Sequence, residues 1–219
     1  MKRVLVTGGS RGIGAAIVDK LKTLEYEVVC PSRQELNLSD AASVKSFIEN
    51  DNSFDILINN AGINPINALE NIPESDWDET NVVNLKSPFL LAQGFAPHMK
   101  KNQWGRIINI SSIFGIASRA ERSVYTSTKA GVNGLTTSLA VELGEYNILV
   151  NSICPGYILT DLTKQNNSEE QIAAISQTIP TRRLGKPEEI AEVVAFLISG
   201  NNTYITGQHI AVDGGFLCQ

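Results

Sequence analysis

Two features are scarce in this sequence: basic charge and long apolar runs. The 18 Lys and Arg residues are outnumbered by 23 Asp and Glu residues, which gives a formal net charge of −5. Nucleic-acid-binding proteins normally carry a basic face, and anionic membrane surfaces attract basic segments. The longest obvious apolar run, Val193–Ile198, is far shorter than the ~20 residues that span a bilayer. We therefore expect neither nucleic acid nor a membrane as a partner.

Cysteine and histidine are scarce as well, with three and two residues respectively. Cys30, Cys154 and Cys218 are odd in number, far apart and without the spacing of metal ligands. We interpret them as reduced thiols of a cytoplasmic protein that holds no metal. At the N-terminus, only Val4–Val6 precede a polar turn, which is too short for the apolar core of a signal peptide.

What the chain does contain is a regular alternation of short apolar segments and helical patterns. Most apolar segments are nearly continuous Val, Ile and Leu runs, as in strands buried on both faces of a parallel sheet. The expected strands are Arg3–Thr7, Glu27–Cys30, Ile56–Asn59, Arg106–Ile110, Leu149–Ile153 and His209–Val212. The expected helices are Gly12–Leu24, Ala41–Glu49, Glu74–Lys101 as one helix or two, Ser123–Glu145 and Pro187–Ser199.

This alternation predicts an α/β fold of the Rossmann type: a doubly wound parallel sheet in a three-layer sandwich. The length of 219 residues suits one domain, and we expect residues 1–219 to form a single dinucleotide-binding oxidoreductase domain. The polar stretch Lys164–Glu170 is expected to be a loop or lid.

A glycine-rich turn, Thr7–Gly14, lies between the first expected strand and the first expected helix. Glycine lets the backbone approach a pyrophosphate closely, and the N-terminus of the helix supplies free N–H groups with a partial positive charge. The spacing is Gly-x3-Gly-x-Gly, unlike the Gly-x-Gly-x-x-Gly of other dinucleotide folds. Such a turn also occurs without a ligand, but its position favours a nucleotide site.

Tyr125 and Lys129 are four residues apart in an expected helix, so their side chains lie on one face. A free phenol has a pKa of ~10, and a neighbouring ammonium lowers it by favouring the phenolate. The pair can therefore exchange a proton with a carbonyl or alcohol oxygen. An isolated Tyr-x3-Lys is more often an aromatic packing residue beside a solvated lysine.

Polar residues follow two further strands. Ser111 and Ser112 come directly after one, and Asn59–Gly62 end another. Ligands of open α/β sheets bind beyond the carboxyl ends of the strands, so these groups are placed to contact a substrate or a cofactor. Each could equally be a turn that satisfies only its own backbone.

Taken together, these motifs occur in the order found in short-chain dehydrogenases/reductases, and the chain resembles the single-domain branch of that family over nearly its whole length. The shared motifs are Thr7-Gly-x3-Gly-Ile-Gly, Asn59-Asn-Ala-Gly, Asn84, Ser112, Tyr125-x3-Lys129, Cys154-Pro-Gly, Arg183–Glu189, Ile205–Gln208 and Val212–Gly215. Each motif alone is weakly specific, whereas the set is highly specific. The chain is similar to 3-oxoacyl-carrier-protein reductases.

The resemblance implies an NADP(H)-dependent reaction between a ketone and a secondary alcohol, for which Tyr125 is the acid and base. Ser112 would polarise the substrate oxygen, Lys129 would lower the Tyr125 pKa and hold the nicotinamide ribose, and Asn84 would support a proton-relaying water. The residues expected to bind the cofactor are Gly8, Ser10, Arg11, Gly12, Ile13, Gly14, Ser32, Arg33, Asn37, Leu38, Asn60, Ala61, Gly62, Tyr125, Lys129, Pro155, Gly156, Ile158 and Thr160.

The residues after the second strand favour NADP(H) over NAD(H). Enzymes selective for NAD usually place an acidic side chain there, on the ribose hydroxyls. Here Cys30 is followed by Pro31, Ser32 and Arg33, and Arg33 can fork onto a 2′-phosphate with Ser32 beside it. If Arg33 is only a solvated surface residue, NAD(H) binds as well.

The chain departs from the family pattern at the adenine end of the site. Only six residues separate Cys30 from Asn37, whereas a parallel crossover usually needs a dozen or more. We therefore expect the helix between the second and third strands to be missing, and the third strand, Glu35–Leu38, to be short or vestigial. Asn37-Leu38 stands where Asp-Val is usual, which keeps a carbonyl acceptor for adenine but removes the charge.

The substrate is left open between a 3-oxoacyl thioester, a sugar and another small carbonyl compound. Carrier proteins are acidic, yet the substrate loop, about Thr160–Pro180, is not basic; Lys100, Lys101, Arg119 and Arg122 are the cations that could dock one. The competing hypothesis is a non-catalytic nucleotide-sensing or regulatory protein on the same fold. Such a protein has no need of the Tyr125–Lys129 pair. Apolar stripes on Glu74–Lys101 and Ser123–Glu145 predict a homodimer or homotetramer, as in relatives.

Overall fold

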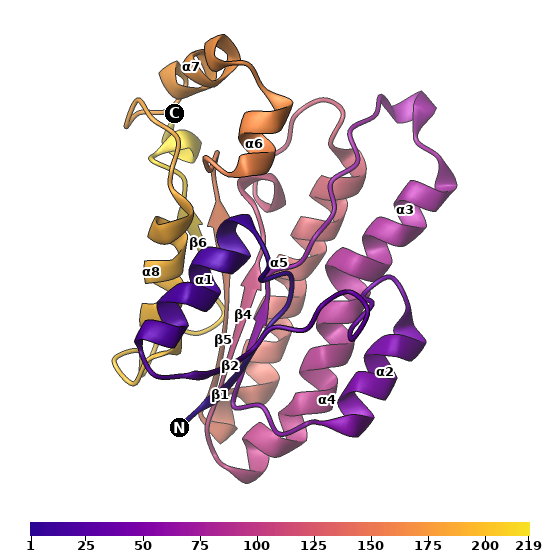
Figure 1. Cartoon of the computed structure of the whole chain (residues 1–219), viewed down its shortest axis with the longest axis vertical. Coiled ribbons are helices and arrows are strands. Elements are labelled where there is room, and N and C mark those ends of the chain that lie inside the picture. The colour runs from indigo at the N-terminus through magenta and orange to yellow at the C-terminus, as the bar shows by residue number, and fades with distance from the viewer.

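A six-stranded sheet forms the centre of the molecule, and every pairing in it is parallel (Figure 1). The computed structural model describes residues 1–219, apart from the side chains of Leu162 and Asn166. The strand order is β2-β1-β3-β4-β5-β6. The strands are β1 Arg3–Val6, β2 Glu27–Val29, β3 Ile56–Asn59, β4 Gly105–Ile110, β5 Ile148–Pro155 and β6 His209–Val212.

Helices cover both faces of this sheet. The α-helices are α1 Gly12–Thr23, α2 Ala41–Asn50, α3 Glu74–Asn81, α4 Ser87–Lys101, α5 Ser123–Leu143, α6 Asp161–Asn166, α7 Glu169–Gln177 and α8 Pro187–Ile198. The short turns are η1 Leu69–Asn71, η2 Val82–Lys86, η3 Ile113–Gly115, η4 Gly144–Tyr146 and η5 Phe216–Cys218. Among the described residues, no helix has the length and hydropathy that crossing a membrane requires.

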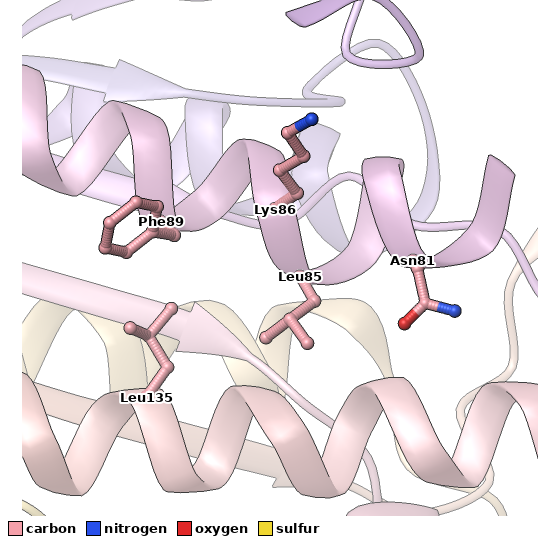
Figure 2. A pocket seen from close by; sticks show the side chains of 5 residues that line it. All are labelled: Asn81, Leu85, Lys86, Phe89 and Leu135. Carbon is pink, nitrogen blue, oxygen red and sulfur yellow. The ribbon is translucent and has the colours of Figure 1, made fainter. Parts of the chain in front are cut away.

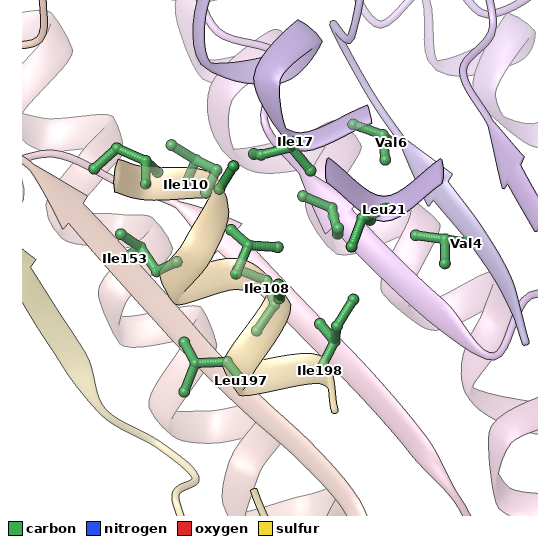
Figure 3. Close-up of a cluster of buried hydrophobic side chains, with 14 of the residues drawn as sticks. Val4, Val6, Ile17, Leu21, Ile108, Ile110, Ile153, Leu197 and Ile198 are labelled. Atoms are coloured by element: carbon green, nitrogen blue, oxygen red, sulfur yellow. The ribbon is translucent and has the colours of Figure 1, made fainter. Parts of the chain in front are cut away.

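Two separate apolar clusters hold the three layers together. The first lies between the sheet and the pair α1 and α8, where Ile17 and Leu21 meet Ile198 and the strand residues Val4 and Ile108 (Figure 3). The second lies on the other face, under α2, α4 and α5. All residues of β3, β4 and β5 are buried, because these central strands have neighbours on both faces. The Rossmann-type three-layer fold predicted from the sequence is confirmed.

The segment between β2 and α2 is short and irregular. Residues 30–40 form turns, so the short strand expected at Glu35–Leu38 is absent from this described segment, and no helix lies there either. Local hydrogen bonds explain the turns, since the Ser32 hydroxyl accepts from the Glu35 amide at 3.4 Å and the Asn37 side chain accepts from the Ser39 amide at 3.2 Å. Side-chain bonds of this kind compete with regular backbone pairing. The sheet therefore ends at β2.

The polar stretch Lys164–Glu170 is predicted from its composition to be a loop, and that prediction is wrong for most of it. The stretch runs through the end of α6 and the start of α7. Thr160 caps α6, and Ser168 and Gln171 form a reciprocal capping box at the start of α7. Polar residues that look like loop formers thus act as helix caps, and the two helices lie beyond one end of the sheet (top of Figure 1).

The order of the strands fixes where a ligand can bind. From β1 the chain crosses to β2 on one side and then to β3 on the other, so the direction of winding reverses between β1 and β3. A crevice opens at the carboxyl ends of strands at such a point. The glycine turn follows β1, Asn60–Gly62 follow β3, Ser111–Ser112 follow β4 and Gly156 follows β5. One edge of the sheet therefore carries all four segments.

Candidate active site

The glycine turn packs closely against the loop after β3. Gly8 and Gly12 have φ angles of +65° and +54°, which other residues rarely adopt. A Cβ on Gly8 would lie 2.9 Å from the Cα of Ala61, and one on Gly14 would collide with the Gly8 carbonyl oxygen. A Cβ on Gly12 would lie 3.3 Å from the methyl carbon of Thr160. Glycine is therefore required at Gly8 and Gly12 by their positive φ angles, and at Gly8 and Gly14 by the close packing of the turn.

The N-terminus of α1 is free to bind an anion. Its N-cap residue, Arg11, makes no side-chain cap, and the first turn of the helix contains no acidic residue. Arg11 and Ser10 are exposed beside it, and Ile13 is partly buried. Free N–H groups and the partial positive charge of a helix N-terminus suit a phosphate, so the site fits a dinucleotide pyrophosphate.

The Asn60 side chain is bonded to the glycine turn. Its side-chain amide donates to the carbonyl oxygens of Thr7 and Gly8 at 3.0 and 2.9 Å. The Thr7 hydroxyl in turn accepts from the amides of Asn60 and Ala61. These bonds join the loop after β3 to the glycine turn, so Asn60 helps to hold the backbone of the turn in place.

Asn84 lies in η2, a single π-turn between α3 and α4, and its side chain is buried. Its carbonyl oxygen accepts from the Ile63 amide at 2.9 Å, while its amide donates to the Ile63 carbonyl at 2.9 Å and to the Thr128 hydroxyl at 3.1 Å. The side chain thus joins the loop after β3 to α5. π-turns are rare and often occur at functional sites.

Tyr125 and Lys129 lie on the same face of α5, as their spacing predicted. The Lys129 ammonium is 5.6 Å from the centre of the Tyr125 ring and donates to the Ile110 carbonyl oxygen at 2.8 Å. A Cβ on Gly62 would lie 3.4 Å from this ammonium and 3.2 Å from the Asn84 carbonyl oxygen. Residues distant in sequence therefore converge on one small volume at the carboxyl ends of β3 and β4.

Ser112 stands between β4 and η3, with its side chain largely buried. Its oxygen accepts from the Phe114 amide at 3.1 Å, which fixes the side chain as the cap of η3. The neighbouring Ser111 is oriented inward and donates to the Lys129 carbonyl at 3.2 Å. Of the two serines, Ser112 is therefore the one beside the phenol, whereas Ser111 braces α5.

Burial governs the titration of both central groups. It raises the pKa of the Tyr125 phenol, while the Ser112 hydroxyl and the positive charge of Arg122 act in the opposite direction. It lowers the pKa of Lys129 from 10.5 to about 8, because a cation loses hydration inside the protein. The phenol therefore carries its proton near neutral pH, as a proton donor to a carbonyl must.

The adenine end of the predicted site is more open. Arg33 is exposed, and its guanidinium donates to the Ser39 hydroxyl at 3.4 Å and lies 3.9 Å from Glu79. Ser32 is also exposed, while Asn37 and Leu38 are partly buried. Because the Asn37 oxygen already accepts a backbone bond, part of its capacity for adenine is in use.

Residues after β5 complete the opposite side of the cleft. Pro155 is the last residue of β5, and a Cβ on Gly156 would lie 2.7 Å from the Cα of Asp213. Ile158 is buried and bridges to Gly185, whereas Thr160 faces Gly12. The predicted residues thus lie along one edge, although Ile158 contributes mainly to the core.

Two contacts of the site were not expected from the sequence: that of Thr128 with Asn84, and the nearness of Arg122, named above only as a docking cation, to Tyr125. Thr128 accepts from Asn84 and donates to the Tyr125 carbonyl at 2.9 Å, so it links the π-turn to α5. Arg122, one turn before Tyr125, carries its charge close to the phenol. Its spacing to Tyr125, three residues, was the available signal. Within the described part of the chain, no group of His, Cys, Asp and Glu side chains could hold a metal ion.

Comparisons with known proteins agree with this geometry. Residues 35–217 match the family model described as enoyl-(acyl carrier protein) reductase. The 3-oxoacyl-(acyl-carrier-protein) reductase FabG of Aquifex aeolicus is 40% identical over 237 aligned residues, which cover 96% of this chain and 95% of the relative.

Two solved structures have nearly the same backbone. A 4-hydroxyisoleucine dehydrogenase complexed with NADH matches with a TM-score of 0.94 and 28% identity, over 100% of both chains. A putative NAD(P)-dependent gluconate 5-dehydrogenase from Beutenbergia cavernae, with bound NADP, matches with a TM-score of 0.93 and 28% identity, over 100% of this chain and 97% of that one. The family match, the identity over nearly the whole chain and the shared fold together show that this chain belongs to the short-chain dehydrogenases/reductases.

Proposed function

We propose that this chain, as one domain of residues 1–219, is an NADP(H)-dependent oxidoreductase that interconverts a ketone and a secondary alcohol. The observation that carries the proposal is the convergence of a protonated phenol, a buried ammonium and a serine hydroxyl beside an uncapped helix N-terminus. The alternative of a non-catalytic nucleotide sensor is not favoured, because such a protein has no use for a buried lysine beside a tyrosine.

Tyr125 is the proposed acid and base. In reduction its phenol gives a proton to the carbonyl oxygen, and Ser112 donates a hydrogen bond to the same oxygen, which stabilises the negative charge that develops there. The nicotinamide of the bound cofactor supplies or accepts the hydride. In the opposite direction the Tyr125 phenolate takes the proton from the alcohol.

Lys129 prepares Tyr125 for this proton exchange. Its ammonium favours the phenolate form, and an ammonium has three N–H groups, of which one is used on the Ile110 carbonyl. The remaining capacity suits the hydroxyls of the nicotinamide ribose. Asn84 holds the loop after Gly62 against α5 through its bonds to Ile63 and Thr128. We also assign to Asn84 the support of a water that relays protons to Lys129.

The cofactor site extends from this centre along the edge of the sheet. The glycine turn and α1 would hold the pyrophosphate, with Gly8, Ser10, Arg11, Gly12 and Ile13 nearest to it and Gly14 in the packing behind. The nicotinamide half would be enclosed by residues that follow β3 and β5: Asn60, Ala61, Gly62, Pro155, Gly156, Ile158 and Thr160. Ser32 and Arg33 would meet the 2′-phosphate of NADP(H), and Asn37 and Leu38 the adenine.

A 3-oxoacyl thioester, a sugar or another small carbonyl compound is the proposed substrate range. The A. aeolicus relative is a 3-oxoacyl-carrier reductase, whereas the two structural neighbours are named for a sugar acid and an amino acid. Cys30, Cys154 and Cys218 are free thiols, which supports a reducing, cytoplasmic location.

We propose further that two copies of the chain associate through α4 and α5. A shallow apolar cavity of about 350 Å³ lies between these helices, lined by Leu85, Phe89 and Leu135 with Asn81 and Lys86 at its rim. Figure 2 shows Leu85 and Phe89 on one helix and Leu135 on the other around this cavity. Phe89 and Val141 on the same two helices are 41% and 81% exposed. A twofold partner presenting the same helices would cover them, giving a homodimer or half of a homotetramer.

Replacing Tyr125 by Phe removes the proton donor while keeping the ring. We expect turnover of the ketone to fall at least ~10³-fold, with NADPH binding retained. Loss of NADPH absorbance measures the rate, and NADPH fluorescence measures binding. A variant that reduces its best ketone at close to the wild-type rate contradicts the proposed role of Tyr125.

Replacing Lys129 by Met tests the buried ammonium through stability. The Lys129 pKa of about 8 lies below its ordinary value of 10.5, so the unfolded chain binds this proton more tightly than the folded protein does. Below pH 8, the buried ammonium therefore lowers the free energy of unfolding by a constant amount. As pH rises from 8 toward 10.5, the contribution of Lys129 to the free energy of unfolding rises, because the folded protein has lost the proton. We expect the variant to be more stable by ~1–3 kcal/mol at pH 7.5 and to lose most of that advantage by pH 10. Urea unfolding of the cofactor-free protein measures this, and a pH-independent difference argues against a depressed Lys129 pKa.

Replacing Arg33 by Gln tests the choice of cofactor. We expect kcat/KM for NADPH to fall ~10- to 100-fold, because a charge-assisted bond to the 2′-phosphate is lost. NADH lacks that phosphate, so its kcat/KM should change less than ~3-fold and serves as the internal control. A wild-type enzyme that prefers NADH refutes the NADP(H) assignment.

Replacing Phe89 by Glu tests the proposed interface. A carboxylate in the apolar cavity should convert the wild-type oligomer into a smaller species in light scattering, since burying an unpaired charge is costly. Leu24→Glu, at a residue 46% exposed at the end of α1, is the matched control and should leave the mass unchanged. A monomeric wild type at micromolar concentration overturns the interface.

A further inference from the structure

The loop between η3 and α5 brings two arginines to the mouth of the active site. Arg122 is the N-cap residue of α5, three residues before Tyr125, and its positive charge favours the ionised form of the Tyr125 phenol. Arg119 lies at the outer end of the same loop and is exposed. We propose that this arginine pair binds an anionic group of the substrate, a carboxylate or a phosphate, and so selects charged carbonyl compounds over neutral ones.

The first observation is an unpaired guanidinium. The Nε and Nη1 atoms of Arg122 are buried, and neither has a hydrogen-bond partner among the described residues. A buried donor without a partner destabilises the fold, and a charged one does so more strongly. The guanidinium has a planar fork that matches carboxylate and phosphate oxygens, so an anion in the cleft would satisfy both atoms.

The second observation is that a second cation, Arg119, lies close to Arg122 and neither has an ion-pair partner within the portion that the structure describes. Burial lowers the pKa of Arg122, the charge of Arg119 lowers it further, and Glu121, Tyr157 and Tyr125 oppose these effects. Glu121 is exposed, and no salt bridge to Arg119 or Arg122 is found in the described part of the chain. Two arginines with no ion-pair partner among the described residues thus lie in the loop that precedes Tyr125.

The third observation is a link across the cleft. Arg119 donates to the Tyr157 hydroxyl at 3.3 Å, and the Tyr157 ring packs edge-on against Phe216 at 5.4 Å. Tyr157 follows Gly156, on the β5 side of the site, whereas Arg119 comes from the β4 side. The two arginines thus lie where a substrate bound between Ser112 and Gly156 would extend.

The inference rests on the proposed ketone–alcohol reaction and narrows its substrate. Because Arg122 is the N-cap residue of the helix that carries Tyr125, three residues before it, we expect the anionic group to lie only a few bonds from the carbonyl that Tyr125 protonates. Oxo acids, sugar acids and phosphorylated ketones have this arrangement. A neutral acyl chain tethered to a carrier protein has no charge at that position.

The test uses pairs of ketones that differ only in charge. For the carboxylate the pair is 4-oxopentanoate and its methyl ester, and for the phosphate it is dihydroxyacetone phosphate and dihydroxyacetone. With NADPH, we expect wild-type kcat/KM to be at least ~10-fold higher for the charged member of one pair than for its neutral member. The pair that shows this difference identifies the preferred anion as a carboxylate or a phosphate. Equal values within both pairs overturn the proposal.

Variants locate the effect. Arg122→Gln should reduce the charged-to-neutral ratio to about one, and Arg122→Lys should restore part of it, because charge remains while the fork is lost. Lys45→Gln, an equal change of charge at an exposed residue of α2, should leave the ratio at the wild-type value. The ratio is independent of how much active enzyme a preparation contains. The opposite outcome is an Arg122→Gln variant that keeps the charged-to-neutral ratio and shows the same altered pH profile with both ketones of a pair. Arg122 would then act only on Tyr125, and the anion site would be refuted.

A binding measurement separates failure of this site from failure of the proposed reaction. Calorimetric titration of 4-oxopentanoate and of dihydroxyacetone phosphate into the NADP⁺-bound enzyme should give binding of one of them that Arg122→Gln abolishes. If wild-type enzyme turns over none of the four ketones but shows this binding, the proposed reaction fails and the anion site stands. If neutral ketones are reduced and neither anion binds, the reaction stands and the anion site fails.

Discussion

The buried ammonium of Lys129 is the constraint on which the active edge of this protein depends. A cation loses much of its hydration when it enters the interior, which is why burial lowers the Lys129 pKa to about 8. The hydrogen bond to the Ile110 carbonyl recovers part of that loss. Several neighbours are arranged around this group: Gly62 leaves room for it, Asn84 fixes the adjacent loop, and Ser111 holds the backbone of α5. A residue that destabilises the fold is thus surrounded by residues that keep it in place.

The parallel sheet places the residues around Lys129 close together at one edge. β1, β3 and β4 are parallel and in register, so the segments that follow them leave the sheet at the same edge. The π-turn η2 then brings Asn84 under the loop after β3, where its amide donates to Thr128 of α5. Four segments far apart in the sequence are joined by short, specific hydrogen bonds. This rigidity holds Tyr125 at a fixed place relative to Ser112 and the glycine turn, which positioning catalysis requires.

The two ends of the cleft contrast in charge and in construction. At the adenine end, residues 30–40 form turns, β2 is the edge of the sheet, and Arg33 is exposed near Glu79. At the substrate end, the buried Arg122 and its neighbour Arg119 concentrate positive charge. The proposed recognition of the substrate therefore depends on electrostatics close to the reacting atoms.

The fold class, the succession of strands and helices along the chain and the Tyr125–Lys129 face could be predicted from the sequence. They follow from local periodicity: continuous apolar runs for buried strands and a four-residue spacing on a helix. Features that depend on contacts between distant segments became visible in the folded molecule alone. Asn60 braces the glycine turn, the polar stretch Lys164–Glu170 forms capped helices, and the guanidinium of Arg122 is buried without a partner among the described residues. Burial and hydrogen-bond partners depend on which segments come into contact in the folded protein. The spacing of residues along the chain does not show which distant segments these are.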